Sequence, residues 1–545
     1  MLQTRYVLPL TLAMAAAQAT AQQPTPPASF GAEIRVNNIT VDVQVWDENG
    51  VPVNGLRRED FRILENDAEQ RLTNFLSVSG GEVQTAADAA LVGATAARQV
   101  LVFFDLYLLT EPDKRVLLEG LKAHFDAGLP PAMTIGVVSF DGSLRVHTRP
   151  TESRERLLEA LKEVERLPAT GLSRQIKLSS YENRLRPGPE SNTRYEQRRY
   201  ENEEYWNELR RMVGRVDAAF SAALQQFAGS PSRKVALLVS PGFPRAENVP
   251  QYRYYDFFLD NPDYRNVALF ADSTMLAANL EYTLYTLDAS GYQDETMMRN
   301  AAERGATGDF TDVARAGFWR EADRKDTLIR AARETGGEAI FSRDGGAAIS
   351  DVERLTASYY SLGYQPDHYG DGKTYAIKVE LVGKPGYKLA HRTSYVDRPF
   401  EAREAERSRA AMLTGYAENP LGVVLALDKP TSKMRLGAAG MRVYKVPAEL
   451  RIPYANLVMI PQGDFAAGQV QVVLVTTDAR GNQSPLNYQR LPIQLPAAQL
   501  DEARQRGYYA FRFTLEMEGG EHALRIAVDD VLGRTSSVAV ANVKL

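Results

Sequence analysis

The sequence contains no cysteine among its 545 residues. Disulfide bonds, thiolate metal sites and cysteine nucleophiles are therefore excluded together, and packing must stabilise the fold. Histidine is also scarce, and no two of the five histidines have the spacing that places metal ligands on one face of a helix. We interpret each of them as a surface or packing residue: His124, His147, His368, His391 and His522.

The chain also lacks a large net charge of either sign. The chain has 64 basic and 69 acidic residues, which gives a net charge of −5 at pH 7. Nothing in this balance favours nucleic acid as a partner. Gly336-Gly337 and Gly345-Gly346 lack the spacing of a phosphate loop and are interpreted as a helix stop and a turn. The sequence therefore predicts no nucleotide chemistry and no cofactor.

Long apolar runs are absent beyond the first 21 residues, so no later segment can span a bilayer, which takes about 20 residues. Residues 1–21 contain one charge, Arg5, then an apolar run from Val7 to Ala17 and the small-residue site Ala19-Thr20-Ala21. This pattern predicts a cleaved signal peptide and a periplasmic or secreted protein without an integral membrane segment. A first transmembrane anchor is disfavoured because the run is short and contains Pro9.

The length exceeds what one hydrophobic core usually supports, so several domains are expected. Residues 22–33 are predicted to be a proline-rich linker, and residues 34–80 a small N-terminal β module around an Asn49-Gly50 turn. A charged helical linker is predicted at 398–420. Short strands over 421–545 predict a C-terminal β-sandwich of immunoglobulin or fibronectin type.

Residues 98–397 contain apolar strands without alternation, separated by helices. Such strands are typical of a doubly wound, mostly parallel α/β sheet with helices on both faces. The predicted strands are 99–105, 134–140, 234–240, 282–288 and 338–342, and the extended segments 359–364, 375–381 and 389–396 are expected to close the sheet. From Trp206 onward, helical spacing predicts an apolar stripe that packs on it: Leu209, Val213, Val216, Phe220, Leu224 and Phe227.

Five short motifs lie along residues 34–397. They are Val41-Asp42-Val43 with Asn49-Gly50 and Asp60-Phe61; Val102–Asp105; Leu237–Gly242; Leu284–Asp288; and Thr335-Gly336-Gly337 with Ser358–Tyr364. Their order and spacing resemble the von Willebrand factor type A (VWA) domain proteins, in particular the secreted VWA-related proteins of Acidobacteria. The resemblance implies a doubly wound domain that binds partners, often through a cation held at the carboxyl ends of the strands.

The resemblance also shows where this chain departs from the family's metal site. Asp105 matches the first ligand, but Tyr107 and Leu109 stand where the family has two serines, and Pro241 stands where it has an aspartate. Thr170 lies near the family's threonine loop. A magnesium ion needs about six oxygens in octahedral geometry, so we expect no metal here and interpret Asp105 as a vestigial position.

Two insertions, at about 174–211 and 243–266, are expected to leave the carboxyl rim of the sheet, where open α/β sheets bind ligands. Both are rich in tyrosine and arginine, which dominate protein interfaces. The candidate partner-binding residues are Tyr195, Arg198, Arg199, Tyr200 and Tyr205 in the first insertion and Tyr252, Arg253, Tyr254 and Tyr255 in the second. The alternative is that these side chains pack the insertions onto the rest of the protein.

The function favoured by these observations is that of a non-catalytic extracytoplasmic binding or scaffold protein, whose partner is a protein or a cell-envelope polymer. One alternative is a hydrolase with a site formed by Asp105, Ser240 and Asp288 at strand ends. Ser240 lacks the G-x-S-x-G frame, and nothing in the sequence indicates its base. A second alternative is a metal-dependent adhesion module.

Overall fold

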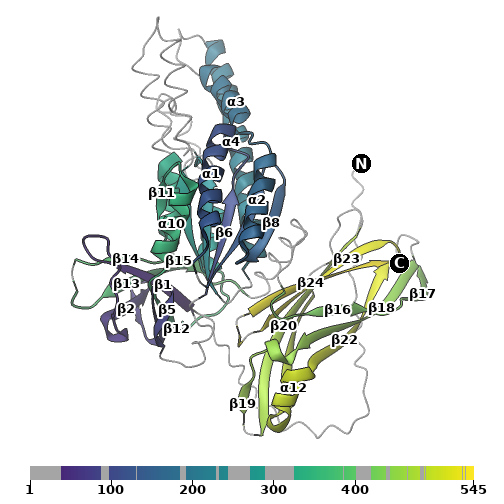
Figure 1. Ribbon diagram of the computed structural model, residues 1–545. Coiled ribbons are helices and arrows are strands. Elements are labelled where there is room, and N and C mark those ends of the chain that lie inside the picture. The colour runs from purple at the N-terminus through teal and green to yellow at the C-terminus, as the bar shows by residue number, and fades with distance from the viewer. Residues whose placement is uncertain are drawn as a thin grey trace, which may run out of the picture. The chain divides into compact units, whose positions relative to one another are not determined.

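The computed structural model describes residues 39–86, 97–130, 132–184, 192–228, 232–243, 270–288, 324–384, 386–399, 419–436, 442–462, 464–478, 484, 487–530, 532–533 and 535–545. These residues form a mixed α/β fold with one mostly parallel sheet and several antiparallel sheets (Figure 1). The chain divides into two compact units. The first unit comprises residues 37–224 and 232–397, and the second contains residues 398–545. The predicted signal peptide and the linker at 22–33 lie outside the described residues.

The central sheet of the first unit has the strand order β11-β10-β9-β6-β7-β8. Its strands are β6 Arg98–Phe104, β7 Met133–Phe140, β8 Leu144–Thr151, β9 Arg233–Ser240, β10 Tyr282–Asp288 and β11 Ala339–Phe341. All pairings are parallel except that of β8, which runs antiparallel to β7 at one edge. Numbered along the chain and read from β8, the order is 3-2-1-4-5-6. The strand order therefore reverses between β6 and β9. Doubly wound sheets bind ligands beside such a reversal, at the carboxyl ends of the strands.

Helices cover both faces of the central sheet (Figure 1). α1 (Glu111–Ala127), α2 (Arg154–Arg166) and α10 (Gly345–Thr356) share a hydrophobic core with one face. The long helix α4 (Asn192–Gln226) packs on the opposite face, where the rings of Phe220 and Phe103 have centroids 5.0 Å apart. α7 (Ala271–Asn279) packs beside β10. The predicted stripe of α4 is confirmed, since Leu209, Val213, Val216, Phe220, Leu224 and Phe227 are all buried.

Gly345 and Gly346 begin α10, which corrects their prediction as a turn. The side chain of Asp344 accepts a hydrogen bond from the Gly346 amide at 2.8 Å and so caps the helix. Both glycines allow α10 to approach α1 closely, because a Cβ at Gly345 would lie 2.4 Å from the carbonyl oxygen of Leu117. The two glycines therefore allow close packing of α10 and α1. Such a tertiary contact cannot be inferred from the turn propensity of glycine alone.

Strands that precede the central sheet in the sequence pair with strands that follow it. Together they form two further antiparallel sheets, ordered β14-β1-β12-β4-β5 and β15-β13-β2-β3. Their bounds are β1 Ile39–Trp46, β2 Phe61–Glu65, β3 Ala68–Gln70, β4 Leu72–Ser79, β5 Glu82–Ala86, β12 Tyr359–Tyr364, β13 Thr374–Leu381, β14 Lys388–Ala390 and β15 Ser394–Val396. β12 to β15 therefore do not close the central sheet, and the N-terminal strands do not form a module alone. Both predictions are corrected, because β1 and β2 complete their shared core only with β12 and β13.

Buried polar side chains join these strands to the amino-terminal end of the central sheet. Arg233 pairs with Asp42, with 3.3 Å between Nε and Oδ2, and donates to the carbonyl of Thr356 at 3.0 Å. Gln44 donates to the hydroxyl of Tyr285 at 2.8 Å. Because this end of the sheet is occupied by the chain itself, ligand binding at the sheet is expected at its opposite, carboxyl end.

The described part of the second unit consists of two antiparallel sheets with a common core. In one, β18 pairs with β16, β17 and β22; in the other, the order is β19-β20-β23-β24 and β21 pairs with β20. The bounds are β16 Val424–Leu427, β17 Thr431–Leu436, β18 Arg442–Pro453, β19 Ile460–Gln462, β20 Phe465–Asp478, β21 Asn487–Pro496, α12 Leu500–Arg506, β22 Tyr508–Glu518, β23 Glu521–Asp530 and β24 Thr535–Lys544. Its immunoglobulin or fibronectin type stays a prediction. None of the helices described in either unit is long and apolar enough to cross a membrane.

Candidate functional site at the carboxyl end of the central sheet

Asp105 and Ser240 meet at the point where the strand order reverses. Asp105 follows β6 and Ser240 ends β9, and the Ser240 hydroxyl donates to Asp105 Oδ2 at 2.8 Å. The other carboxylate oxygen, Oδ1, accepts from the amide of Leu108 at 3.1 Å. Ser240 Oγ in turn accepts from the amide of Gly242 at 3.2 Å. Both oxygens of Asp105 are thus bound by the protein, and the residue is 0% exposed.

Burial is also the main influence on the charge of Asp105. Removal from water raises its pKa to about 7, although the Ser240 hydroxyl, backbone amides and the charge of Arg174 oppose the shift. The Asp105 carboxyl group therefore keeps its proton to a higher pH than an ordinary aspartate does. A protonated group offers a cation much less charge than an ionised aspartate.

Tyr107 occupies the position where the VWA resemblance places a metal-binding serine, and its ring is covered by two arginines. The guanidinium carbon of Arg174 lies 3.1 Å from the ring centroid, and Arg174 Nε donates to the Tyr107 carbonyl at 3.0 Å. Arg215 lies 5.1 Å from the same centroid and donates to the phenolic oxygen at 3.3 Å. Tyr107 is only 3% exposed. Two guanidinium groups thus cover the side chain that stands in place of a ligand, and the charge of Arg174 acts on Asp105.

The other positions of the implied metal site fit a cation no better. Leu109 is 0% exposed and belongs to the core beneath the sheet. The Thr170 hydroxyl donates to the Tyr107 carbonyl at 3.3 Å, and Pro241 offers no side-chain oxygen. These residues cannot supply the oxygens that a magnesium ion requires. We call this arrangement of Asp105, Tyr107, Arg174, Arg215 and Ser240 the closed rim.

The backbone around Gly171 packs tightly against the closed rim, which gives a first prediction. A Cβ at Gly171 would lie 1.9 Å from the carbonyl oxygen of Leu108, whereas a Cβ at Gly214 in α4 would meet nothing within 4 Å. We expect Gly171→Ala to lower the free energy of unfolding by about 2 kcal/mol or more, because backbone must move. Gly214→Ala should leave it unchanged or raise it by up to about 1 kcal/mol.

Urea unfolding followed by tryptophan fluorescence measures this prediction. The three tryptophans, Trp46, Trp206 and Trp319, all precede residue 398, so their emission reports on the first unit alone. Equal urea midpoints for the two alanine variants would show that the segment at Gly171 is not tightly packed.

The structure describes only some of the candidate partner-binding residues. Tyr195, Arg198, Arg199 and Tyr200 lie on the first part of α4, and their side chains are outside the described part of the structure. Tyr205 is 2% exposed, which corrects its prediction as a partner-binding residue. Its position one helical turn before Leu209 places it on the buried stripe of α4. The second group, Tyr252, Arg253, Tyr254 and Tyr255, lies wholly outside the described residues.

Sequence reasoning missed an apolar pair on α3 (Gly171–Arg184), which lies beside the closed rim and rises beyond the central sheet (Figure 1). Leu172 is 57% exposed and Ile176 is 62% exposed, and residues four apart lie on one face of a helix. Lys177 of α3 pairs with Glu208 of α4 at 2.8 Å, which holds the two helices together. The signal available in the sequence was the spacing of Leu172 and Ile176, four residues apart, in a helix with many polar residues.

The residues of the hydrolase alternative are partly brought together. Asp288 is the register partner of Ser240 on β10, and it is 8% exposed. A different serine has the geometry of a catalytic relay: Ser139 Oγ lies 2.8 Å from His147 Nε2, and His147 Nδ1 lies 3.0 Å from Glu163 Oε2. Ser139 is 0% exposed, so no substrate carbonyl can reach its hydroxyl in this structure. The relay therefore serves to join β7, β8 and α2.

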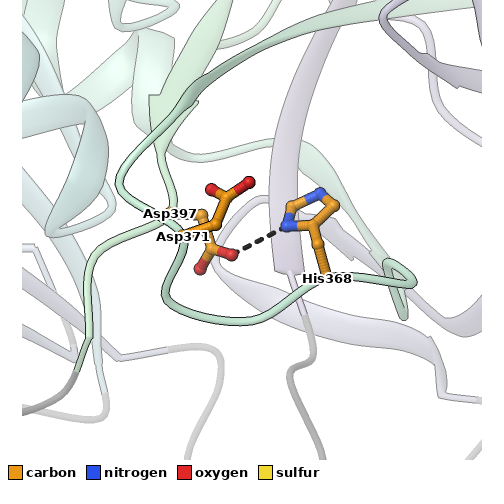
Figure 2. A group of neighbouring side chains, drawn as sticks. All are labelled: His368, Asp371 and Asp397. Carbon is orange, nitrogen blue, oxygen red and sulfur yellow. Dashed lines mark hydrogen bonds and ion pairs between the residues drawn. The ribbon is translucent and has the colours of Figure 1, made fainter.

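A second cluster of titratable groups, also missed by sequence reasoning, lies at β13 and β15. His368, Asp371 and Asp397 converge there (Figure 2), and His368 also contacts Glu65 at the end of β2. His368 is partly buried, hydrogen-bonded to two carboxylates and stacked on Tyr375, so it packs within the fold as one of the predicted possibilities. Only the short spacing from His368 to Asp371 was visible in the sequence, because Asp397 and Glu65 are brought to it by strand pairing.

No family model matches the chain, and no curated protein sequence matches it. Solved structures similar to it include proximal thread matrix protein 1 from the mussel byssus, with 10% identity over 54% of this chain and 51% of that one and a TM-score of 0.24. The manganese-loaded TRAP protein of Plasmodium vivax has 8% identity over 54% and 92%, with a TM-score of 0.22. The ArnB paralog VWA2 of Sulfolobus acidocaldarius has 11% identity over 68% and 80%, with a TM-score of 0.19.

Weak structural neighbours of the chain thus include VWA-domain proteins. The chain spans about half the length of the mussel protein. At these TM-scores the neighbours contribute no argument about the site.

Proposed function

We propose that this chain is a non-catalytic extracytoplasmic protein-binding or scaffold protein, built on a VWA-like domain whose cation position is closed by its own side chains. The observation that carries the proposal is the stacking of Arg174 and Arg215 on the buried ring of Tyr107, directly beside Asp105. The placing among secreted VWA-related proteins of Acidobacteria rests on the sequence motifs, and secretion rests on the pattern of residues 1–21.

The electrostatics of the closed rim support recognition without a cation. Asp105 has its pKa raised to about 7 by burial, and both of its oxygens accept hydrogen bonds from the protein. Each positive charge within a few ångströms adds repulsion against an incoming ion. A partner that docks at this end of the sheet must therefore be bound by side-chain contacts.

The surface that can supply those contacts is formed by α3 and the first part of α4. Leu172 and Ile176 expose an apolar face on α3. The adjoining helix carries Tyr195, Arg198, Arg199 and Tyr200 in its sequence. Tyrosine and arginine are enriched in protein interfaces, because their side chains give large contact area and polar ends.

A capture experiment tests this surface. The wild-type protein, the double variant Leu172→Ser/Ile176→Ser and a control variant Val424→Ser would each be immobilised and exposed to an envelope extract in the presence of EDTA. Val424 is 52% exposed and lies in the second unit, so it matches the exposure of the α3 pair. We expect the wild type and Val424→Ser to capture the same partner and the double variant to retain less than about a tenth of it.

A wild type that captures nothing in EDTA but captures a partner when magnesium replaces the EDTA would contradict recognition without a cation. Capture that survives in the double variant would contradict recognition through α3. Equal losses in the double variant and in Val424→Ser would point to nonspecific apolar adsorption, which also contradicts it.

The hydrolase alternative has the relay of Ser139, His147 and Glu163 as its specific observation. We predict that a fluorophosphonate probe, which labels activated and accessible serines, does not react with the folded protein, because Ser139 and Ser240 are both fully buried. Mass spectrometry would detect the adduct. Stoichiometric labelling that disappears in Ser139→Ala or in Ser240→Ala would show an enzyme.

A further inference from the structure

His368, Asp371 and Asp397 come from two segments of the first unit and point toward one another (Figure 2). His368 and Asp371 lie in the segment between β12 and β13, and Asp397 directly follows β15. Each offers one ligand atom, and these atoms all lie within 4.8 Å of one another. Tetrahedral zinc with bonds of about 2.0–2.1 Å holds its ligand atoms roughly 3.3 Å apart, so only a small closing movement is needed. We propose that these three side chains bind a divalent transition-metal ion of the zinc class.

The orientation of the imidazole favours a metal at Nδ1. Its other nitrogen, Nε2, lies 3.0 Å from Glu65 Oε1, and a metal-binding histidine characteristically donates this second N–H to a carboxylate. Glu65 is held in turn by the hydroxyls of Tyr364 at 2.6 Å and Tyr395 at 2.8 Å. Nδ1 then faces Asp397 Oδ2 at 2.7 Å. An ion bound here replaces the proton shared by these two atoms.

The rings around His368 fix its plane. Tyr375 stacks on the imidazole with centroids 3.6 Å apart and an interplanar angle of 8°. The hydroxyl of the same tyrosine donates to Asp371 Oδ2 at 2.7 Å, which holds the second carboxylate toward the histidine. The ligands are therefore positioned before an ion arrives, which reduces the entropy lost on binding.

The charge around the cluster favours a cation. Three carboxylates, those of Glu65, Asp371 and Asp397, surround one imidazole. Opposing charges come from Lys373, whose Nζ lies 3.1 Å from Asp371 Oδ2, and from Arg392, whose guanidinium carbon lies 5.6 Å from the ring centroid of Tyr395. The Lys373 side chain is 76% exposed, so it can move into solvent at little cost when an ion takes its place.

The donor set selects the class of ion. One imidazole nitrogen with two carboxylate oxygens suits zinc or manganese, whereas calcium and magnesium prefer oxygen ligands alone. A bound ion would fasten the last residue of the first unit, Asp397, to the segment that carries Asp371, where the Gly372 amide already donates to the Asp397 carbonyl at 2.7 Å. The effect of binding should therefore appear in the stability of the first unit.

Zinc binding to the full chain tests the proposal directly. After treatment with EDTA, the protein would be dialysed against ZnCl2, and bound zinc would be counted by mass spectrometry. We expect one zinc per chain in the wild type and none in His368→Gln or Asp371→Asn. Saturating zinc should raise the melting temperature of the first unit, read from tryptophan fluorescence, by about 5 °C.

His124→Gln is the matched control. Its side chain is 18% exposed, compared with 19% for His368, and it contacts a single carboxylate, Glu353, at 2.8 Å. This variant should bind zinc like the wild type. Binding below a tenth of an ion per chain in the wild type, or undiminished binding in Asp371→Asn, would overturn the proposal. Asp371 is at the surface, so Asp371→Asn decides the question even if His368→Gln fails to fold.

Discussion

The variant Asp105→Asn is expected to be more stable than the wild type at pH 8 and equally stable near pH 4. Burial raises the pKa of Asp105 from an ordinary 3.8 to about 7. Between these two values the folded protein keeps a proton that the unfolded chain releases. The free energy of unfolding of the wild type therefore falls as the pH rises from about 4 to about 7, and then stays level.

Asparagine has no proton to lose. Its Oδ1 can accept from the Leu108 amide as Asp105 Oδ1 does, and its Nδ2 can donate to Ser240 Oγ, which reverses the direction of that hydrogen bond. Because one pKa unit corresponds to about 1.4 kcal/mol, the shift of about three units sets an upper limit of about 4 kcal/mol for the gain at pH 8. We expect a measured gain of about 2 kcal/mol, since some structural relaxation accompanies ionisation.

Urea unfolding at pH 4.5, 6 and 8, followed by tryptophan fluorescence, measures this gain. Asp351→Asn serves as a control, because Asp351 is on the surface of α10 with a 45% exposed side chain and its pair with Arg354 contributes little. Parallel pH profiles for the wild type and Asp105→Asn would contradict a carboxyl group that is neutralised by burial. A loss of stability in Asp105→Asn at pH 8 would show that the ionised carboxylate of Asp105 stabilises the folded protein.

Tyr107→Ala is expected to destabilise the first unit by about 3–5 kcal/mol, the usual cost of deleting a buried aromatic ring. The ring is 3% exposed, lies 5.3 Å from that of Phe140 and is stacked by Arg174. Its removal leaves a cavity and two guanidinium groups without their aromatic partner.

Tyr107→Phe separates the ring from the hydroxyl. It removes only the hydrogen bond from Arg215 at 3.3 Å, so a loss of about 1 kcal/mol is expected. Urea midpoints compared with the wild type at pH 7 give both values. If Tyr107→Ala stayed within about 1 kcal/mol of the wild type, the ring would not close the rim.

The buried strands of the central sheet could be predicted from the sequence because their apolar runs need no alternation. β6, β9 and β10 begin and end within about two residues of the predicted limits. β8 could not be predicted in this way. It is a half-exposed edge strand with mixed composition, and it is specified by its pairing with β7.

The pairings between strands that are distant in the chain could not be predicted from the sequence either. Strands with a single buried face, such as β1 and β12, alternate in a manner that fits several partners. Their actual pairing joins Val41 to Leu362, far along the chain. The same limit applies to the clusters. Asp105 was identified from a motif, whereas its bond to Ser240, the cover of Tyr107 by Arg174 and the meeting of His368 with Asp397 all depend on tertiary structure.

Calorimetric titration of MgCl2 into the wild type and into Asp105→Asn tests the closed rim most directly. The comparison isolates the rim, because an ion bound at His368 would affect both proteins equally. A closed rim predicts no difference in heat between them up to millimolar magnesium. Micromolar binding in the wild type that disappears in Asp105→Asn would contradict it, and would place a functional cation at the carboxyl end of the sheet.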